Sequence, residues 1–356
     1  MIVIEAGDAT TLFRMACHKL VADGVTYRRG GALMRELPGP VCAVLTDPRR
    51  NMVLHPVRQL NPWVTLAEFP WMMTGRRDIG WLLPYMPRAM DYSDDGATWR
   101  AAYGPRLRRW DRGPDAEPLD QLGHLAGLLI GEPNTRRAVA TIWDPTLDTE
   151  PGSKDYPCTN WMQFLVNPES GALDMTVVMR SNDLWWGWSG VNVMNFTLLH
   201  QLMAGVTSLE LGTYRHISGN LHIYPRHQQE AEALVDNDKP FNPTLEDPGL
   251  THTGSLADFT EQCGHAMGWV RGQRDQVWLD AGGYTRDDVA QAIGLDADNW
   301  LVHWAHFMDR HRALVHVPRL AAEQILQGVE FMAWRLAAIR WISHLKKTKG
   351  GQEANA

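Results

Sequence analysis

The stretch LDMTVVMRSNDLWWGWSGVNVMNFTLLHQLMAGVTSLELGTYRHISGNLHIY, residues 173–224, decides the fold class. Its first part, 173–181, is rich in apolar and β-branched residues and predicts a strand bounded by turn residues. Residues 192–206 predict a long helix that is apolar on one face and throughout its centre. Residues 208–224 return to strand character. This mixture has no regular alternation of strand and helix, so it predicts an α+β fold rather than a doubly wound sheet.

The same mixture extends toward the N-terminus, whereas the C-terminal third is different. Strands are predicted at 41–47, 136–144 and 161–167, and helices at 12–24, 66–75 and 119–133. A segment rich in Pro, Asp, Asn and Gly, 237–255, predicts a loop or linker. We therefore expect an α+β domain over residues 1–250, a helical extension over 251–349 and a disordered tail over 350–356.

The composition excludes several classes of protein. The chain has 356 residues with 44% hydrophobic and 21% charged residues, which is ordinary for a globular protein. Its net charge of −7 argues against a general nucleic-acid binder. No apolar run approaches the roughly 20 residues that a membrane span needs. The first residues lack the basic start and cleavage site of a signal peptide, so we expect a cytoplasmic protein.

Four cysteines are present, and they are too dispersed for a zinc site or a disulfide framework. Cys17, Cys42, Cys158 and Cys263 form no CxxC pair, so no metal site is predicted and the thiols are expected to be free. Cys158 lies in SKDYPCTNWMQF, between a proline and two small polar residues. Such a cysteine is either a structural residue or a nucleophile, and its own neighbours do not decide between the two.

Polar residues that suit an anion follow the strand at 173–181. Arg180 can hold a phosphate with two parallel hydrogen bonds, and Ser181 can add a hydroxyl group. A surface arginine beside a turn is the structural alternative. The cluster Trp185, Trp186 and Trp188 offers indole faces for stacking on a heterocycle, although aromatic clusters more often belong to a core.

Two further pairs have both a binding and a structural interpretation. His222 and Tyr224 lie two residues apart, so on a strand they point to the same face and could bind a sugar hydroxyl. Arg136 and Arg137 are adjacent, and both can reach an anion only if they lie in a loop. Each pair alone is more often structural.

The order of these motifs is more specific than any one of them. AEFPW (67–71), AYG (102–104), TRR (135–137), PCTN (157–160) and MRSND (179–183) are followed by an asparagine and then by GNLHIY. This order resembles the thymidylate synthase superfamily, over about residues 25–230. Synthases carry Cys-His at the nucleophile, whereas CTN and MRSND resemble the nucleotide hydroxymethylase branch.

The resemblance implies a thymidylate synthase fold, a large mixed sheet flanked by helices that forms a homodimer through its sheet. It implies that the thiolate of Cys158 adds to C6 of a pyrimidine nucleotide and makes C5 nucleophilic. A nearby cation, Arg180, is expected to lower the pKa of that thiol. Glu68 would organise proton transfers and water, Tyr103 would assist proton handling at C5, and Asn192 would face N3 and position 4 of the base.

The remaining roles concern the nucleotide and the folate 5,10-methylenetetrahydrofolate, which the resemblance implies as the one-carbon donor. The implied phosphate ligands are Arg180, Ser181 and Arg29 (or its neighbour Arg28), with Arg136 and Arg137 reaching the site of the partner subunit. The other implied contacts are Gln163 to the nucleotide, His222 and Tyr224 to the sugar 3′-hydroxyl, Asp183 to the pterin, and Trp186 as the stacking indole.

The chain departs from the family pattern at three points. The interval from Arg180 to Asn192 is one residue longer than usual. A gapless alignment would therefore put Val191 at the base-reading position. We favour Asn192 because a valine cannot hydrogen-bond a base edge. An asparagine suits uracil, whereas a deoxycytidylate enzyme has an aspartate there. The short C-terminal segment of synthases is replaced by about a hundred helical residues.

The sequence therefore predicts a transferase that hydroxymethylates a pyrimidine nucleotide 5′-monophosphate at C5. The nucleotide stays open among dUMP, dCMP and CMP. A true thymidylate synthase and a non-catalytic nucleotide- or RNA-binding relative are the alternatives. No membrane or nucleic-acid partner is expected.

Overall fold

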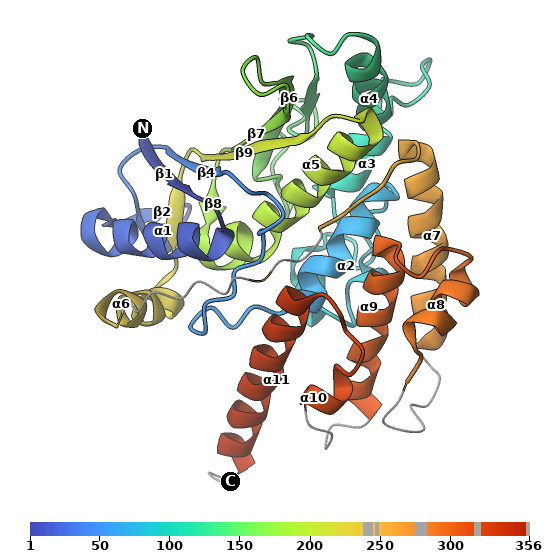
Figure 1. Cartoon of the computed structure of the whole chain (residues 1–356). Helices are drawn as coiled ribbons and strands as arrows, with labels where there is room; N and C mark the ends of the chain where they lie inside the picture. Colours follow the sequence, from blue (N-terminus) through green and yellow to red (C-terminus); the bar gives the residue numbers. More distant parts are fainter. Residues whose placement is uncertain (238–244, 246–248, 275–282, 317–321, 354–356) are drawn as a thin grey trace.

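A mixed sheet forms the centre of the N-terminal two-thirds of the molecule (Figure 1). The computed structural model describes residues 1–237, 245, 249–274, 283–316 and 322–353. In this part of the chain the large sheet consists, in spatial order, of β1 (Ile2–Ala6), β4 (Val41–Leu45), β9 (Leu211–Ser218), β7 (Leu173–Met179), β6 (Thr159–Val166) and β5 (Val139–Thr141). The β1–β4 and β7–β9 pairs are parallel and the others antiparallel, which confirms the predicted α+β class.

The two faces of this sheet have different environments. On β9, Tyr214, His216 and Ser218 are buried, and α5 (Val193–Thr207) packs along that side. The intervening residues Thr213, Arg215 and Ile217 are only half-buried. Because successive side chains of a strand point to opposite faces, one face of the sheet belongs to the core and the other is covered much less by this chain.

A second, smaller sheet carries the segments that follow β7 and β9. Its order is β2 (Val25–Arg29), β3 (Ala32–Glu36), β10 (Leu221–Ile223) and β8 (Asn182–Asp183). Short connections bring β8 directly after β7 and β10 directly after β9. The π-helix η3 (Leu184–Asn192) continues from β8 and leads into α5.

The helix α2 (Pro62–Met73) is surrounded by other elements. Of its 12 residues, Glu68 is the one that is not buried. The C-terminal helices are α7 (Leu256–Gln273), α8 (Arg286–Ile293), α9 (Trp300–His316), α10 (Ala322–Ile325) and α11 (Met332–Glu353) (Figure 1). Of these, α7, α9 and α11 contact α2, while α8 and α10 pack against α9. The indole of Trp304 donates to the carbonyl of Leu66 at 2.8 Å, and the ring of Trp63 stacks on Phe307. The helical extension and α2 therefore share one hydrophobic core.

The remaining helices include two that the sequence pattern predicts, at 12–24 and 119–133, and several short ones that it does not. They are α1 (Ala9–Asp23), which ends at Gly24 as predicted, α3 (Tyr103–Arg108), α4 (Gln121–Gly131) and α6 (Gln228–Asp236), with short turns at η1 (Ile79–Trp81), η2 (Pro87–Tyr92) and η4 (Pro225–His227). In the described residues no helix is long and apolar enough to cross a membrane.

Three sequence expectations differ from the structure or lie outside it. The strand predicted at 136–144 is reduced to β5, and beyond it the backbone N–H groups of Ile142 and Trp143 both donate to the carbonyl of Asn160, which interrupts the regular ladder. Most of the linker predicted at 237–255 lies outside the described residues. The helix α11 continues to Glu353, into the segment predicted as a disordered tail; residues 354–356 are not described.

Candidate active site

Cys158 lies immediately before β6, at the end of the large sheet. The register of the β6–β7 pair sets Thr159 opposite Met179, and the backbone N–H of Arg180 donates to the carbonyl of Cys158 at 2.9 Å. All four cysteines lie in the described residues and are free; Cys158 is half-buried, whereas the other three are buried. It is therefore the thiol that a small molecule can reach.

Arg180 is held beside this thiol by backbone carbonyls. Its Nε donates to Pro157 O at 2.9 Å and its Nη2 to Tyr156 O at 3.3 Å, while the guanidinium lies over the ring of Trp143. The cation lowers the pKa of Cys158, as expected, but burial raises it more, and the net pKa is above its ordinary value. The predicted effect of Arg180 is therefore present, but it does not outweigh the effect of burial.

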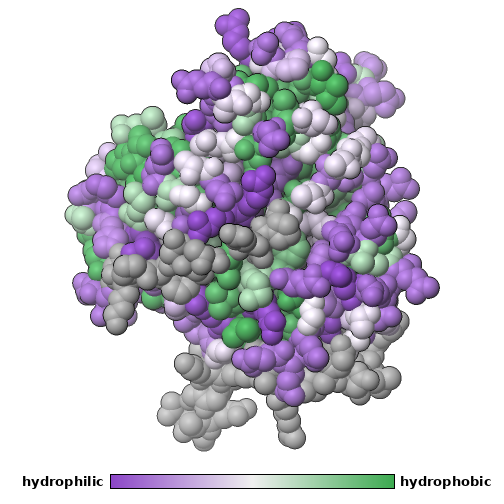
Figure 2. Space-filling view, in the orientation of Figure 1, coloured by the Kyte–Doolittle hydropathy of each residue, from purple (hydrophilic) through white to green (hydrophobic). Residues whose placement is uncertain are grey.

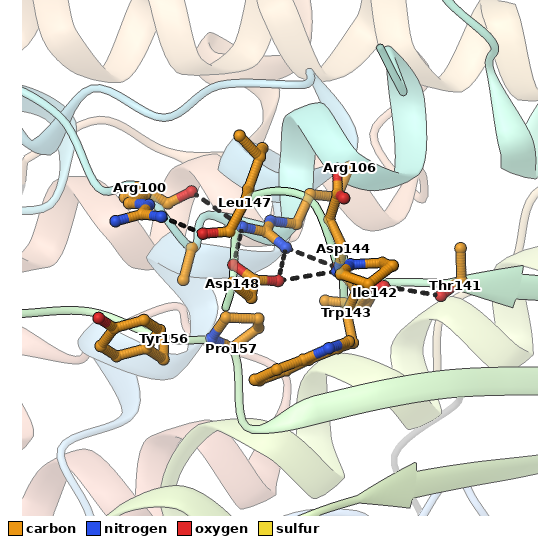
Figure 3. Close-up of polar contacts among 12 residues, drawn as sticks. Arg100, Arg106, Thr141, Ile142, Trp143, Asp144, Leu147, Asp148, Tyr156 and Pro157 are labelled. Atoms are coloured by element: carbon orange, nitrogen blue, oxygen red, sulfur yellow. Dashed lines mark hydrogen bonds and ion pairs between the residues drawn. The ribbon is translucent and has the colours of Figure 1, made fainter. Parts of the chain in front are cut away.

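A buried ion pair fixes the segment that contains Trp143 and Asp144 (Figure 3). Arg106 donates to both carboxylate oxygens of Asp148, at 2.5 and 2.8 Å, and to the carbonyl of Ile142 at 2.7 Å. Figure 3 shows that Trp143 and Pro157 lie beside this pair. Because a bidentate arginine–carboxylate pair has a defined geometry, it holds in place the segment on which the guanidinium of Arg180 rests.

Glu68 is a carboxylic acid in an apolar helix. Burial raises its pKa to about 7, Asn195 Nδ2 donates to its Oε2 at 3.0 Å, and the negative charge of Asp155 raises the pKa further. A carboxyl group with a pKa near 7 can both accept and donate a proton at neutral pH. Asn195 had not been predicted; its buried Oδ1 has no partner among the described residues, which suits a bound water or substrate donor.

Tyr103 lies close to both Cys158 and Glu68. Its hydroxyl accepts hydrogen bonds from the Oγ1 and the backbone N–H of Thr159, at 3.0 and 3.3 Å. Burial is the main cause that raises its pKa, and the neighbouring Cys158 and Glu68 contribute in the same direction. Thr159, which replaces the histidine of synthases, therefore holds the tyrosine while leaving the hydroxyl proton free to donate.

A second acid that the sequence did not reveal lies three residues before the cysteine. Asp155 accepts from the backbone N–H of Ala101 at 3.1 Å, and burial raises its pKa to about 6. Its charge affects the pKa of both Glu68 and Cys158. Its signal in the sequence is weak because an aspartate two residues before a proline is also an ordinary turn residue.

Three of the predicted sugar and phosphate residues, Arg29, Ser181 and His222, belong to one hydrogen-bonded network. Asn220 Nδ2 donates to Glu36 at 2.7 Å, so its Oδ1 accepts from His222 Nδ1 at 2.8 Å and from Ser181 Oγ at 3.5 Å. This leaves His222 Nε2 buried and without a partner among the described residues, as an acceptor for a hydroxyl group. Arg29 donates twice to the same Glu36, at 2.7 and 2.5 Å.

Tyr224 completes this region. Its ring packs edge-on against His222, with 5.1 Å between the ring centroids, and lies under Arg226. The structure therefore brings together His222, Tyr224, Ser181 and, through Glu36, Arg29.

The π-helix η3 accounts for the long spacing before Asn192. A π-turn holds more residues than an α-helical turn, so η3 absorbs one extra residue without displacing α5. Val191 is buried, whereas Asn192 is half-buried and its Oδ1 accepts from Asn182 Nδ2 at 3.0 Å. The half-buried polar side chain at this place is thus that of Asn192, and its base-reading role stays a prediction.

Only one of the three clustered tryptophans is available for stacking. Trp186 is 41% exposed, whereas Trp185 and Trp188 are 6% and 1% exposed and belong to the core. Asp183 accepts from the backbone N–H groups of Trp185 and Trp186, at 3.0 and 3.3 Å, and so caps η3. A buried cation, Arg58, lies near both Asp183 and the ring of Trp185.

Three predicted residues lie apart from this cluster. Arg136 and Arg137 are exposed in the connection between α4 and β5, where Arg137 pairs with Glu132 at 2.7 Å. Gln163 donates to the carbonyl of Arg136 at 3.1 Å, so it holds this connection against β6. Within one chain the structure shows no contact between these three side chains and Cys158.

The assembled groups suit covalent chemistry on an electron-poor ring. They comprise a reachable thiol beside an arginine, two acids with raised pKa values and a tyrosine hydroxyl. In the described residues no group of three or more His, Cys, Asp or Glu could hold a metal ion.

Comparisons with known proteins identify relatives of the chain. A family model described as "Thymidylate synthase" matches residues 19–262. The chain is 34% identical over 230 residues to a "Deoxyuridylate hydroxymethyltransferase" of Bacillus phage SP01, in a match that covers 63% of this chain and 59% of that protein. It is 31% identical over 264 residues to the protein of the same name in Delftia phage PhiW-14, covering 70% and 71%.

One relative matches the full length. The "Deoxyuridylate hydroxymethyltransferase" of Pseudomonas phage M6 is 30% identical over 365 residues, a match that covers 100% of this chain and 98% of that protein. The helical extension is therefore shared with at least one relative.

Proposed function

The chain belongs to the thymidylate synthase family, and we propose that it transfers a one-carbon unit to C5 of dUMP and forms 5-hydroxymethyl-dUMP. The observation that carries this proposal is the position of Cys158 beside Arg180, with Tyr103 close to both Cys158 and Glu68. The name of the full-length relative supports both the hydroxymethyl product and the uracil base.

Binding of the nucleotide prepares the thiol. The 5′-phosphate binds Arg180 and Ser181, and the sugar 3′-hydroxyl donates to the free Nε2 of His222. As the base enters, its C6 meets Cys158. The thiol passes its proton to a neighbouring base, and the guanidinium of Arg180 stabilises the thiolate that attacks C6. The new S–C6 bond turns C5 into a nucleophile.

The acids then move protons at C5. 5,10-Methylenetetrahydrofolate supplies the methylene group when bound and leaves as tetrahydrofolate. Tyr103, whose hydroxyl is oriented by Thr159, relays the proton that C5 must lose: it passes its own proton on as it takes this one up. Glu68, with its pKa of about 7, binds a water together with the free Oδ1 of Asn195 and deprotonates it as it adds to the exocyclic methylene. The S–C6 bond finally breaks and restores the thiolate.

Three features fit the folate. Trp186 offers an exposed indole face for the pterin, and the carboxylate of Asp183 lies at the N-terminus of the same π-helix. The buried cation Arg58, which donates to Ser189 at 2.7 Å, attracts an anionic ligand to this side.

The less covered face of the large sheet supports a homodimer. Val3, Val139, Trp161 and Leu165 expose apolar surface from three strands of that face, and Figure 2 shows hydrophobic surface near the N-terminus. An exposed sheet face of this kind suits a self-complementary interface. Arg136 and Arg137 lie beside it, where they reach the phosphate bound by the partner subunit.

The mass of the product tests the proposed function. Purified protein is incubated with 5,10-methylenetetrahydrofolate and dUMP, and the nucleotide is analysed by mass spectrometry. We expect a gain of CH2O together with release of tetrahydrofolate. A gain of CH2 with release of dihydrofolate would identify a synthase instead, and an unchanged nucleotide would contradict the proposal.

A further inference from the structure

A row of buried polar side chains leads from the large sheet to Asn192. The hydroxyl of Tyr214 lies 2.7 Å from His216 Nδ1, and His216 Nε2 lies 2.8 Å from Asn182 Oδ1. Asn182 Nδ2 in turn donates to Asn192 Oδ1 at 3.0 Å. Tyr214, His216 and Asn182 are each at most 2% exposed, so water does not compete for their hydrogen bonds.

The first member of the row fixes the direction of every donor. Among the described residues, His216 Nδ1 is the only hydrogen-bond partner of the Tyr214 hydroxyl. A phenol has one proton to donate, and leaving it unpaired in the core is costly. Tyr214 is therefore the donor and Nδ1 the acceptor.

The direction passes on through the histidine to Asn182. Burial lowers the pKa of His216 to about 3, so the ring is neutral and carries its one proton on Nε2. This N–H needs an acceptor, which must be the oxygen of the Asn182 amide. Ser218 Oγ donates weakly to the same oxygen, at 3.4 Å. The nitrogen of Asn182 is consequently turned toward Asn192.

The side-chain amide of Asn192 is thereby held in one orientation. Its Oδ1 receives Asn182 Nδ2, and its own Nδ2 has no partner among the described residues. The side chain does not cap α5 either. A base edge that meets this amide encounters a free N–H donor and the second lone pair of an oxygen.

These two groups match uracil and oppose cytosine. Uracil presents an acceptor, O4, and a donor, N3–H, and both find partners on an amide in this orientation. Cytosine presents an amino group at position 4 and an acceptor at N3, so donor would face donor and acceptor would face acceptor.

Gly187 packs directly against the Asn182–Asn192 bond. A Cβ atom at this position would lie 2.7 Å from both Asn182 Nδ2 and Asn192 Oδ1, closer than any side chain tolerates. A side chain at position 187 would therefore clash with both amides, and only glycine leaves room for their hydrogen bond.

We propose that Tyr214, His216 and Asn182 are positioning residues that orient the amide of Asn192 for a uracil base and against cytosine. This inference rests on the proposed function, because it assigns the base-reading role to Asn192.

We call Tyr214, His216 and Asn182 together the relay. Two substitutions test it without removing Asn192. In the Asn182→Asp variant both oxygens accept, so Asn192 turns its nitrogen toward the carboxylate and presents its oxygen to the base. We expect the ratio of kcat/KM for dUMP to kcat/KM for dCMP to fall by about tenfold or more. Tyr214→Phe removes the donor that sets the direction, and the same ratio should fall by a smaller factor.

A neighbouring buried histidine provides the matched control. His200 lies on α5, and its Nε2 donates to the carbonyl of Leu173 at 2.6 Å, outside the relay. His200→Gln is expected to lower stability and leave the ratio unchanged, which separates a directional effect from a general disturbance of the core.

The outcomes distinguish this inference from the proposed function. Dissociation constants of dUMP and dCMP, measured calorimetrically without folate, report base preference independently of turnover. If the wild-type protein binds dUMP more tightly than dCMP, and both variants show a smaller difference between the two affinities, the relay is supported even if no product forms. Wild-type preference for dCMP, or an unchanged preference in Tyr214→Phe, would overturn the relay even if 5-hydroxymethyl-dUMP is made. If Asn182→Asp fails to fold, Tyr214→Phe decides.

Discussion

Asn195 Nδ2 donates to Glu68 Oε2 over 3.0 Å, while the Oδ1 of the same amide is buried without a partner in the described residues. Glu68 lies on α2, which packs against the helical extension, and Asn195 lies on α5, which packs against the large sheet. The hydrogen bond therefore connects these two helices. A carboxyl group and a free acceptor oxygen that lie close together can bind a water molecule and activate it.

The raised pKa of Glu68 predicts a pH-dependent stability. Its pKa increases from 4.5 to about 7 on folding, so its contribution is fully present below pH 4.5 and is lost as the pH rises through 7. Glu68→Gln stays neutral and avoids this loss. The variant's free energy of unfolding, relative to wild type, should rise between about pH 5 and pH 8 by on the order of 1–2 kcal/mol, a value discounted because Glu68 is partly exposed.

Urea unfolding at both pH values measures this difference, with exposed Glu117→Gln as the surface control. The same Glu68→Gln variant should lose turnover by about a hundredfold or more, because a general acid or base is removed. A stability difference that is equal at both pH values would contradict the assigned pKa.

The exposed indole predicts a selective effect on the folate. Trp186→Ala should raise the KM for 5,10-methylenetetrahydrofolate by about tenfold, since one stacking contact is worth about 1–3 kcal/mol, and leave the KM for dUMP nearly unchanged. Trp185, which packs against Phe13 and stacks on His227, is the matched control. Trp185→Ala should instead lower the free energy of unfolding by about 3 kcal/mol. Equal folate KM values for wild type and Trp186→Ala would exclude the stacking role.

The sharing of arginines across a dimer predicts complementation between inactive variants. Cys158→Ser lacks the nucleophile, and the double variant Arg136→Ala, Arg137→Ala lacks the proposed phosphate ligands. In a mixed dimer one site combines the intact Cys158 of one chain with the intact arginines of the other. Co-expression should thus restore about a quarter of wild-type activity, since about half of the dimers are mixed and one of their two sites is complete. If the mixture stays inactive, the arginines do not act across an interface.

The ion pair in Figure 3 predicts a large loss of stability on removal of one partner. Asp148→Ala leaves the buried guanidinium of Arg106 unpaired and should cost about 3–5 kcal/mol. The exposed pair of Arg88 and Asp91 provides the comparison, and Asp91→Ala should cost less than about 1 kcal/mol. Chemical denaturation of both variants measures the difference; similar losses would show that burial of the Arg106–Asp148 pair does not matter.

Much of the fold follows from local patterns in the sequence. The strand–helix–strand succession of residues 173–224 and the helical character after residue 256 are both present in the structure, because periodicity and turn residues are local signals. Trp185, Trp186 and Trp188 show the limit of such signals. Their spacing cannot tell which ring is exposed, since this depends on how η3 packs against distant elements.

The site was only partly predictable for the same reason. Cys158 and Glu68 belong to motifs with recognisable neighbours, whereas Asn195 acquires its meaning from a residue 127 positions away. His216 is an ordinary strand residue until its contact with Asn182 is known. The lowering effect of Arg180 on the pKa of Cys158 was predictable from the sequence, whereas the larger, opposing effect of burial was not.

The covalent bond between Cys158 and C6 of the nucleotide is tested most directly with 5-fluoro-dUMP. Fluorine replaces the hydrogen that must leave C5 as a proton, so the adduct cannot proceed and accumulates. After incubation with 5,10-methylenetetrahydrofolate, intact-protein mass spectrometry should show one nucleotide and one folate added to the wild-type chain, on the peptide that contains Cys158, and no addition to Cys158→Ser. A wild-type protein that binds the nucleotide yet gains no mass, or an adduct that persists in Cys158→Ser, would contradict this mechanism.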